Sequence, residues 1–206
     1  PAKLNLFLEL LARRPDGFHE IDTVMIPIDW RDELDLQRIP DNRVDLQVQW
    51  LPSLQVVAQR LGVEVESSTG RNLLEIPADE SNLVHRALTA FRNAFEIKDG
   101  FSCQLGKQIP AGAGLGGASS DAASALLCAA RLCDIPTDTP QLSELAAQIG
   151  SDVPFFLGMG GTEPIDGARA TGRGEQIKAI ELGKKLDCVV IFPAVCLSTA
   201  AVYANS

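Results

Sequence analysis

The chain has 206 residues, of which 46% are hydrophobic and 22% are charged. These proportions are ordinary for a soluble globular protein, and they exclude a disordered chain, a collagen and a coiled coil. With 18 basic and 27 acidic residues, the formal net charge is −9, which disfavours non-specific binding to nucleic acid or to an anionic membrane. No apolar run reaches the roughly 18 residues that a membrane-spanning helix needs.

The five cysteines are odd in number, lack CxxC spacing and mostly lie in apolar runs. They predict reduced cysteines that act as small hydrophobic residues in a cytoplasmic protein. A plastid location is the alternative if the source is a plant. The two histidines are too few for a His-rich zinc site. The chain begins at Pro1 without a signal-peptide pattern, and the lack of an initiating Met indicates that the true N-terminus is missing.

Alternating apolar residues predict several strands. Leucines occupy every second position from Leu4 to Leu10, which indicates a strand with one apolar face. Residues 51–71 are less periodic, and we expect from them only a short strand at residues 63–65 and a loop at residues 67–70. Further strands are predicted at residues 22–30, 34–36, 44–50, 101–105 and 188–192, the last of which is expected to be buried.

Three segments predict helices. Ser81 is the expected N-cap of a helix over residues 81–95, whose apolar residues recur at helical spacing. An Ala-rich helix is predicted over residues 120–133, and Thr139-Pro140 begins another that ends at Gly150. Strands come first and helices mix in later, without regular βαβ alternation, so the predicted fold class is α+β.

A glycine-rich loop spans residues 110–120, with four glycines between Gly112 and Gly117. Glycines let backbone N–H groups approach an anion closely, and the helix expected next presents its positive N-terminus, so the loop predicts a phosphate site. Gly112, Gly114 and Gly117 also satisfy the GxGxxG dinucleotide fingerprint. That fingerprint needs a buried parallel strand before it, whereas the residues here are polar and interrupted by Pro110. The Walker pattern is absent, and a glycine turn without a ligand is the structural alternative.

The loop, together with the Ala-rich helix after it, resembles the phosphate-binding motif of the GHMP kinase superfamily, which includes galactokinase, homoserine kinase and mevalonate kinase. Further segments resemble the branch of this superfamily that phosphorylates 4-(cytidine 5′-diphospho)-2-C-methyl-D-erythritol. Their order along the chain also agrees with that branch. The segments are residues 1–8, 14–19, 81–84, 150–156, 172–175 and 193–203.

The resemblance implies a GHMP kinase fold of the α+β class, with a ribosomal protein S5 domain 2-like N-terminal domain and the start of a ferredoxin-like C-terminal domain. The expected boundary gives a catalytic, ATP-binding domain over residues 1–185 and the beginning of the second domain over residues 186–206. The family's second glycine-rich stretch is not found before Ser206, so most of the second domain is expected beyond it. Residues 51–71 and 163–170 are extensions relative to the family.

Two residues carry the catalytic chemistry that the resemblance implies. Asp152, in the segment Gly-Ser-Asp-Val-Pro-Phe-Phe, would take the proton from the C2 hydroxyl of the substrate. Taken alone, it is equally consistent with an aspartate that makes a turn hydrogen bond. Lys3 would stabilise charge on the nucleophile, because a lysine that begins a core strand is held in place. Asn5 lies two residues on, hence on the same strand face, and would bind the methylerythritol hydroxyls.

The remaining implied roles concern the cytidine part of the substrate, ATP and Mg²⁺. Phe18, His19, Thr199 and Tyr203 would bind the cytidine part, with Tyr203 stacking on cytosine and His19 contacting its edge. ATP would be the co-substrate with Mg²⁺, for which the sequence shows no carboxylate cage, so Ser120 is the candidate ligand. The implied ATP-binding residues are Asn82, Leu83, Lys107, Pro110, Ala111, Gly112, Ala113, Gly114, Leu115, Gly116, Gly117, Ala118, Ser119 and Ser120.

Together these residues predict an ATP-dependent small-molecule kinase of non-mevalonate isoprenoid biosynthesis. It would transfer the γ-phosphate of ATP to the 2-hydroxyl of 4-diphosphocytidyl-2-C-methyl-D-erythritol, with neither nucleic acid nor a membrane as partner. A GHMP kinase for a different alcohol would keep the glycine-rich loop but lack the cytidine-binding residues Phe18, His19 and Tyr203. A non-catalytic nucleotide-binding module or an inactive fragment is the second alternative, and intact Lys3 and Asp152 argue against it.

Overall fold

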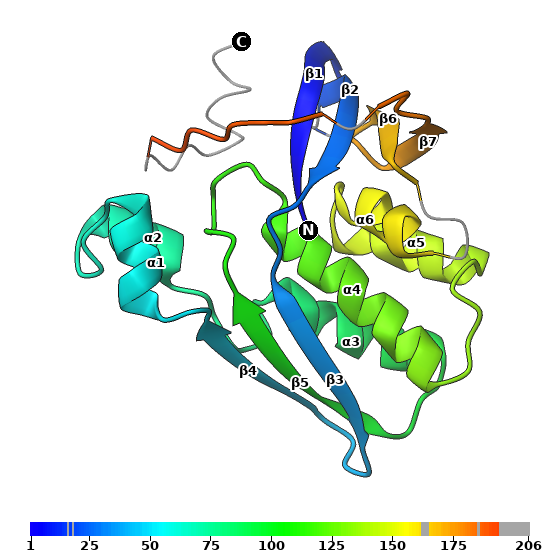
Figure 1. Cartoon of the computed structure of the whole chain (residues 1–206). Coiled ribbons are helices and arrows are strands. Elements are labelled where there is room, and N and C mark those ends of the chain that lie inside the picture. The colour runs from blue at the N-terminus through cyan, green and yellow to red at the C-terminus, as the bar shows by residue number, and fades with distance from the viewer. Residues whose placement is uncertain (16, 18, 162–164, 185, 194–206) are drawn as a thin grey trace.

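The computed structural model describes residues 1–15, 17, 19–161, 165–184 and 186–193. Within these ranges the chain forms a four-stranded sheet, a three-stranded sheet and helices that pack against both (Figure 1). The combination of one antiparallel sheet, one mixed sheet and helices confirms the predicted α+β class.

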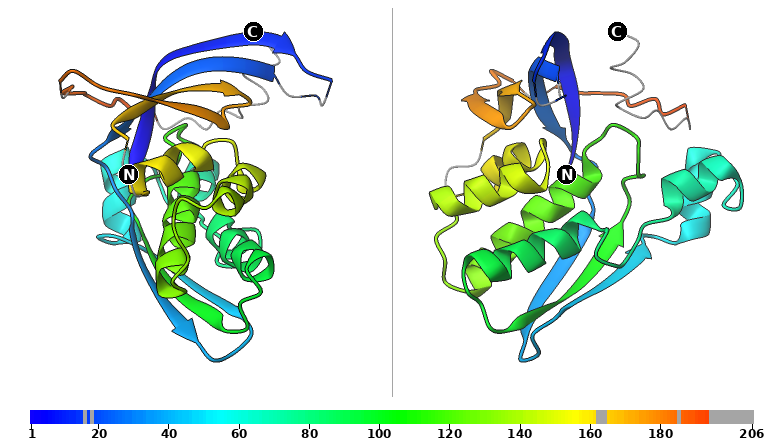
Figure 2. Two further views of the ribbon diagram at one scale, coloured as in Figure 1. Left: turned by 90° about the vertical axis from the view of Figure 1, so that its right-hand side faces the viewer. Right: turned by 180° about the vertical axis from the view of Figure 1, so that it is seen from behind.

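The four-stranded sheet is antiparallel throughout. Its first two strands form a long hairpin that extends away from the helices (Figure 2). Arg169 and Asp22 pair across neighbouring strands of this sheet, with Nε 2.7 Å from Oδ1. In sheet order, the strands are β1 (Ala2–Arg13), β2 (His19–Ile28), β6 (Gly167–Gly172) and β7 (Gln176–Ile180).

The apolar face predicted for β1 is exposed instead of facing the core. Leu6, Phe7 and Leu8 are between 42% and 49% exposed, and only Ala2 and Lys3 of this strand are buried. The pairing register with β2 shifts between residues 5 and 7, which interrupts the simple alternation. Leu4 still packs against the buried cluster of Ala2, Ile109 and Leu115. Because the hairpin leaves the helices after its first residues, Leu6 and Leu8 have no packed layer over them within the described chain.

The three-stranded sheet combines both strand directions. Its central strand, β5 (Gly100–Lys107), is antiparallel to β3 (Glu33–Ile39) and parallel to β4 (Val44–Trp50). Alternation predicted all three strands, and the structure confirms them. Phe101, Cys103 and Leu105 of β5 are buried against the helices, so this sheet has one covered face that supports the end of β5, where the glycine-rich loop begins.

Four helices pack together beside this sheet; the first two contact it directly, and the last contacts β6 and β7 of the four-stranded sheet. They are α3 (Leu83–Ala94), α4 (Gly117–Leu132), α5 (Pro140–Ile149) and α6 (Val153–Gly160). Phe91 of α3, Leu126 of α4 and Phe155 of α6 are completely buried in one core. Each such side chain contributes about 1.5–3 kcal/mol to folding. The alanines of α4 let the neighbouring helices approach closely, which fixes the start of α4 beside both sheets.

Two helix starts differ from the prediction. Asn82, not Ser81, caps α3, because its Oδ1 accepts the Val84 N–H at 2.8 Å, while the Ser81 hydroxyl donates to Asp79 at 2.6 Å. Helix α4 begins at Gly117, three residues before the predicted start at Ser120. The glycines therefore continue into the first helical turn, which shortens the loop.

Residues 51–71 contain helices where a strand and a loop were predicted. Helix α1 (Leu54–Leu61) and helix α2 (Ser68–Leu74) pack on each other around Val57 and Leu73. The indole N–H of Trp50 donates to the Leu74 carbonyl at 2.8 Å, which ties the pair to the end of β4. The apolar residues Leu54, Val57, Ala58 and Leu61 recur at helical spacing along α1 and pack in one cluster, so the sequence carried a helix signal that the prediction missed.

The buried strand predicted at residues 188–192 is wrong for this structure. Val189 is 90% and Ile191 is 86% exposed, and the segment has no strand assignment. No strand among the described residues pairs with it, so Val189 and Ile191 remain in solvent, whereas Phe192 packs against the cluster around Val57 and Leu73. The proposed boundary at residue 185 stays a prediction. None of the helices in the described residues is long and apolar enough to cross a membrane.

Candidate functional site

Lys3 is held at the start of β1 by contacts on both its backbone and its side chain. Its N–H donates to the Leu115 carbonyl of the glycine-rich loop at 2.9 Å. Its buried ammonium donates to Asn5 Oδ1. The Asn5 amide in turn donates to the Thr23 hydroxyl at 2.6 Å, and that hydroxyl donates to the Phe7 carbonyl at the same distance. The predicted shared face of Lys3 and Asn5 is present, and Thr23 is a member of the network that sequence reasoning missed.

Asp152 lies at the N-terminal end of α6 and turns toward Lys3. Its Oδ2 is 3.7 Å from the Lys3 Nζ, and its side chain is 33% exposed. An aspartate at this position usually accepts a helix N–H, but Asp152 makes no capping hydrogen bond with its side chain. The carboxylate thus faces both Lys3 and solvent, which is a suitable place for a group that accepts a proton from a bound alcohol.

The glycine-rich loop closes against the same two elements. Gly116 has a φ of 72° and caps α4. A Cβ at this residue would stand 3.0 Å from both the Lys3 stem and the Phe156 ring. Glycine is therefore required here by backbone conformation and by close packing together. On the other side of the loop, a Cβ at Gly150 would lie 3.9 Å from the Ser119 hydroxyl, so the first turn of α4 approaches the segment that carries Asp152.

The first turn of α4 presents N–H groups that an α-helix leaves without partners of its own. The Ser120 N–H, which donates to the Gly116 carbonyl at 2.9 Å, marks where bonding within the helix begins. The N-terminal end of a helix also carries partial positive charge. The loop, Lys3 and Asp152 thus bring an anion-binding helix end, a fixed cation and a partly exposed carboxylate into one region.

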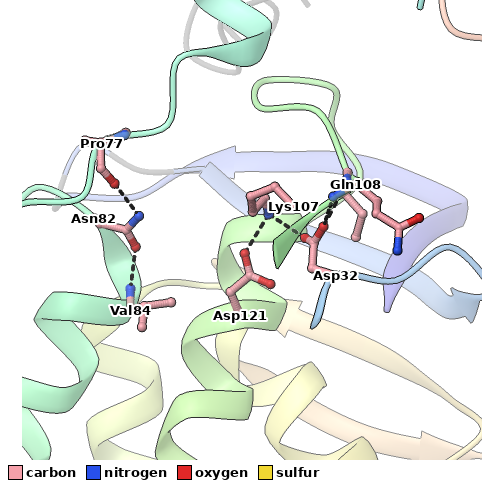
Figure 3. Close-up of polar contacts among 8 residues, drawn as sticks. Asp32, Pro77, Asn82, Val84, Lys107, Gln108 and Asp121 are labelled. Atoms are coloured by element: carbon pink, nitrogen blue, oxygen red, sulfur yellow. Dashed lines mark hydrogen bonds and ion pairs between the residues drawn. The ribbon is translucent and has the colours of Figure 1, made fainter. Parts of the chain in front are cut away.

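Sequence reasoning missed a buried ion cluster beneath the loop, which Figure 3 shows. The ammonium of Lys107 donates to Asp32 and, at 2.6 Å, to Asp121 Oδ2. Lys107 is 3% exposed, so its ammonium is held by the two carboxylates and is not solvated. Burial raises the pKa of Asp121 to about 7, although Lys107 lowers it. Asp32, between β2 and β3, was the available signal in the sequence, but its partner Lys107 is 75 residues away along the chain.

The side chains of two predicted ATP-binding residues are engaged with protein groups. Lys107 lies between two carboxylates, as described above. Asn82 is buried, with its amide donating to the Pro77 carbonyl at 2.7 Å and its Oδ1 capping α3 (Figure 3). The polar atoms of both side chains support local structure, and their part in an adenine pocket stays a prediction.

The predicted cytidine-binding residues are not brought together within the described chain. His19 begins β2 and pairs with Arg13, at the end of the hairpin opposite Lys3. Phe18, Thr199 and Tyr203 lie outside the described residues.

A cavity of about 1030 Å³ lies beside α4, and neither Lys3 nor Asp152 is among the residues that line it. Its walls include Trp30, Ser124, Phe156 and Leu182. Of the predicted site residues, Ser120 alone is among those that line it within the described part of the chain. Ser120 is buried, and the described residues contain no group of three or more His, Cys, Asp or Glu side chains that could hold a metal ion.

Comparison with known proteins gives a consistent result. Residues 82–160 match the family model for the GHMP kinases N terminal domain. The chain is 50% identical to a 4-diphosphocytidyl-2-C-methyl-D-erythritol kinase of Rhodopirellula baltica, over 100% of the chain and 64% of that relative. It is 37% identical to the enzyme of the same name from Bacillus velezensis, over 98% of the chain and 60% of the relative. The chain thus spans somewhat less than two thirds of these curated relatives.

Solved structures support the same fold. A crystal structure of 4-(cytidine 5′-diphospho)-2C-methyl-D-erythritol kinase matches with a TM-score of 0.59 and 34% identity, over 88% of this chain and 54% of that one. A mevalonate kinase structure matches with a TM-score of 0.51 at 12% identity, which shows likeness of fold alone. The fold, the glycine-rich loop within residues 82–160 and the named relatives agree, and the chain belongs to the GHMP kinase family.

Proposed function

We propose that this chain carries the ATP-binding and catalytic part of a small-molecule kinase. The reaction would transfer the γ-phosphoryl group of ATP to the 2-hydroxyl of 4-diphosphocytidyl-2-C-methyl-D-erythritol, a step in non-mevalonate isoprenoid biosynthesis. The names of relatives at 50% and 37% identity support the substrate assignment. The observation that carries the proposal is the Lys3–Asp152 pair, at 3.7 Å, beside the glycine-rich loop.

In this mechanism the chain positions two substrates and moves one proton. Asp152 takes the proton from the substrate hydroxyl, whose oxygen forms a bond to the γ-phosphorus while the bond between the β-γ bridging oxygen and that phosphorus breaks, releasing ADP. Lys3 stabilises the negative charge on the attacking oxygen. Asn5 keeps the Lys3 ammonium in place through its Oδ1. One N–H of its amide is donated to Thr23, and we propose that the other binds the methylerythritol hydroxyls.

The nucleotide phosphates are held mainly by backbone groups. Backbone N–H groups within residues 112–119, in the loop and the first turn of α4, would bind the phosphate oxygens, and the helix dipole favours their charge. Mg²⁺ is part of the proposal and supplies charge neutralisation when it is bound to the nucleotide. Because the described residues form no cage for it, we expect phosphates and water to be its principal ligands. Asn82 and Leu83 remain candidates for the adenine pocket.

Recognition of the cytidine part is assigned to Phe18, His19, Thr199 and Tyr203 on the basis of sequence resemblance. We also infer a cytoplasmic location, with the small-molecule substrate as the partner. It is supported by the four described cysteines, which are free thiols, as cysteines in a reducing compartment are.

An assay of ADP release tests the proposed function. The full chain is incubated with ATP, Mg²⁺ and one alcohol at a time: the cytidylyl methylerythritol, homoserine or mevalonate. We expect turnover with the cytidylyl alcohol and little with the others. Faster turnover with another alcohol would overturn the substrate assignment, and the absence of ATP binding would overturn the kinase assignment.

A further inference from the structure

Asp32 contacts the chain where the glycine-rich loop begins. Its Oδ1 accepts the N–H of Gln108 at 2.5 Å and that of Ile109 at 2.9 Å, and its Oδ2 accepts the ammonium of Lys107. The Asp32 side chain is 4% exposed. A carboxylate from the connection between β2 and β3 therefore binds three consecutive residues at the end of β5 and the start of the loop.

The same cluster reaches the other end of the loop. Lys107 also donates to Asp121, which lies in the second turn of α4, at 2.6 Å. A Cβ at Gly117, the first residue of α4, would stand 3.5 Å from Asp32 Oδ2 and 2.9 Å from the Ile109 side chain. The cluster thus connects the start of the glycine-rich loop to α4, the helix that follows the loop (Figure 3).

Stability alone is a weak reason for such a cluster. Two carboxylates and one ammonium are buried together, and the desolvation of buried ions commonly offsets their attraction. Buried ions do add geometric specificity, because charge-assisted hydrogen bonds hold the donor and the acceptor at a short, fixed separation. Here the fixed groups are the two ends of a loop whose glycines have little conformational preference of their own.

We propose that Asp32 is a positioning residue, which uses Lys107 and Asp121 to hold the glycine-rich loop in the shape that receives a nucleotide phosphate. The ligand class, a nucleoside triphosphate, rests on the proposed function. The mechanical part of the proposal, namely that the cluster fixes the distance between the end of β5 and the start of α4, does not rest on it. Asp32 touches no reacting atom in this proposal and acts through the loop backbone.

Hydrogen–deuterium exchange of the full chain without nucleotide tests the mechanical part. In Asp32→Asn, the amide oxygen can still accept the backbone N–H groups, but the NH₂ group opposes the Lys107 ammonium. We expect faster exchange of the amides of residues 111–119, with exchange in α3 unchanged. Asp29→Asn is the matched control, because Asp29 pairs with Arg31 at 2.9 Å on the surface and is 91% exposed. Unchanged loop exchange in folded Asp32→Asn would overturn the proposal.

Nucleotide affinity tests the functional part. We expect Asp32→Asn to raise the Kd for ATP roughly 2- to 30-fold, the range found when a residue acts through a network, and to leave the KM for the alcohol little changed. Loss of stability with unchanged ATP affinity would reduce Asp32 to a structural residue. If Asp32→Asn speeds the exchange of the loop amides but the wild-type chain binds no ATP, the proposed function is overturned and the mechanical part is supported.

A second variant covers the case in which Asp32→Asn does not fold. Lys107→Met combined with Asp121→Leu removes the bridge to α4 and fills the space with apolar atoms. Because Asp32 then lacks its cation, the variant is expected to be less stable, and it is used only after circular dichroism shows that it is folded. Asp32 keeps its two backbone hydrogen bonds. We expect faster exchange in the first turn of α4 and weaker ATP binding. Wild-type exchange and wild-type ATP affinity in this folded double variant would overturn the proposal.

Discussion

The ammonium of Lys3, at the start of β1, lies 3.7 Å from the carboxylate of Asp152, at the start of α6. The pair is asymmetric in exposure, with side chains 9% and 33% exposed respectively. A pair this open to solvent contributes only about 0–1 kcal/mol to stability. The role that we propose for the pair is therefore chemical, since the more exposed partner is the one that can meet a substrate hydroxyl.

Replacing Asp152 tests its role as the base. We expect Asp152→Asn to reduce kcat by about 10²-fold or more, because the amide cannot accept the hydroxyl proton, while ATP affinity stays close to that of the wild type. Steady-state kinetics and calorimetry measure the two effects. Asp138→Asn, at an exposed residue outside the site, is the control and should leave both unchanged. A turnover within a few-fold of wild type for Asp152→Asn would remove it from the mechanism.

Replacing Gly116 tests the phosphate loop. We expect Gly116→Val to abolish ATP binding, because the valine side chain would collide with Lys3 and Phe156 and because a β-branched residue avoids a positive φ. Gly183→Val is the control, since a Cβ there has no neighbour within 4 Å and its φ is ordinary. Calorimetry on folded protein gives the affinities. Unchanged ATP affinity in folded Gly116→Val would show that the loop does not bind phosphate.

The cytidine assignment depends on Tyr203, which lies outside the described residues, and its test is kinetic. Base–aromatic stacking is worth about 1–3 kcal/mol, so Tyr203→Ala should raise the KM for the cytidylyl substrate roughly 5- to 150-fold and leave the KM for ATP unchanged. Tyr203→Phe is the matched control, because the stacking surface survives without the hydroxyl. His19→Ala should act in the same direction as Tyr203→Ala. An unaltered KM for the cytidylyl substrate in Tyr203→Ala would refute the assignment.

Local patterns predicted the elements whose stability comes from a clear apolar face. Strands β3, β4 and β5 alternate in the sequence as they do in the structure, and α5 begins at Pro140 and ends before Gly150 as expected. The alternating leucines of β1 misled the prediction of burial, because alternation shows that a face is apolar and not that another layer covers it. The apolar run at residues 188–192 failed for the same reason.

Long-range polar contacts could not be read from sequence in this way. Asp32 has the appearance of a surface turn residue until the fold brings Lys107 and Asp121 to it. The proximity of Lys3 and Asp152 was expected only through the family resemblance, since no periodicity links residues at such a separation. By contrast, the glycine-rich loop was identifiable directly, because four glycines before an Ala-rich helix change local backbone preferences enough to be recognised.

Stability should depend on pH through Asp121. Burial raises its pKa in the folded protein to about 7, against the opposing effect of Lys107 and with the added effect of Asp32, whereas an unfolded chain exposes an ordinary aspartate. Between these two pKa values the folded state binds more protons than the unfolded state. The contribution of Asp121 to stability is therefore full at acidic pH and decreases as the pH rises toward and through about 7. Urea unfolding from pH 5 to pH 8 should show this decrease, and Asp121→Asn, although less stable overall, should show a smaller one. Asp29→Asn, at an exposed site, should keep the wild-type pH dependence. An equal dependence in Asp121→Asn and wild type would mean that Asp121 stays ionised across this range.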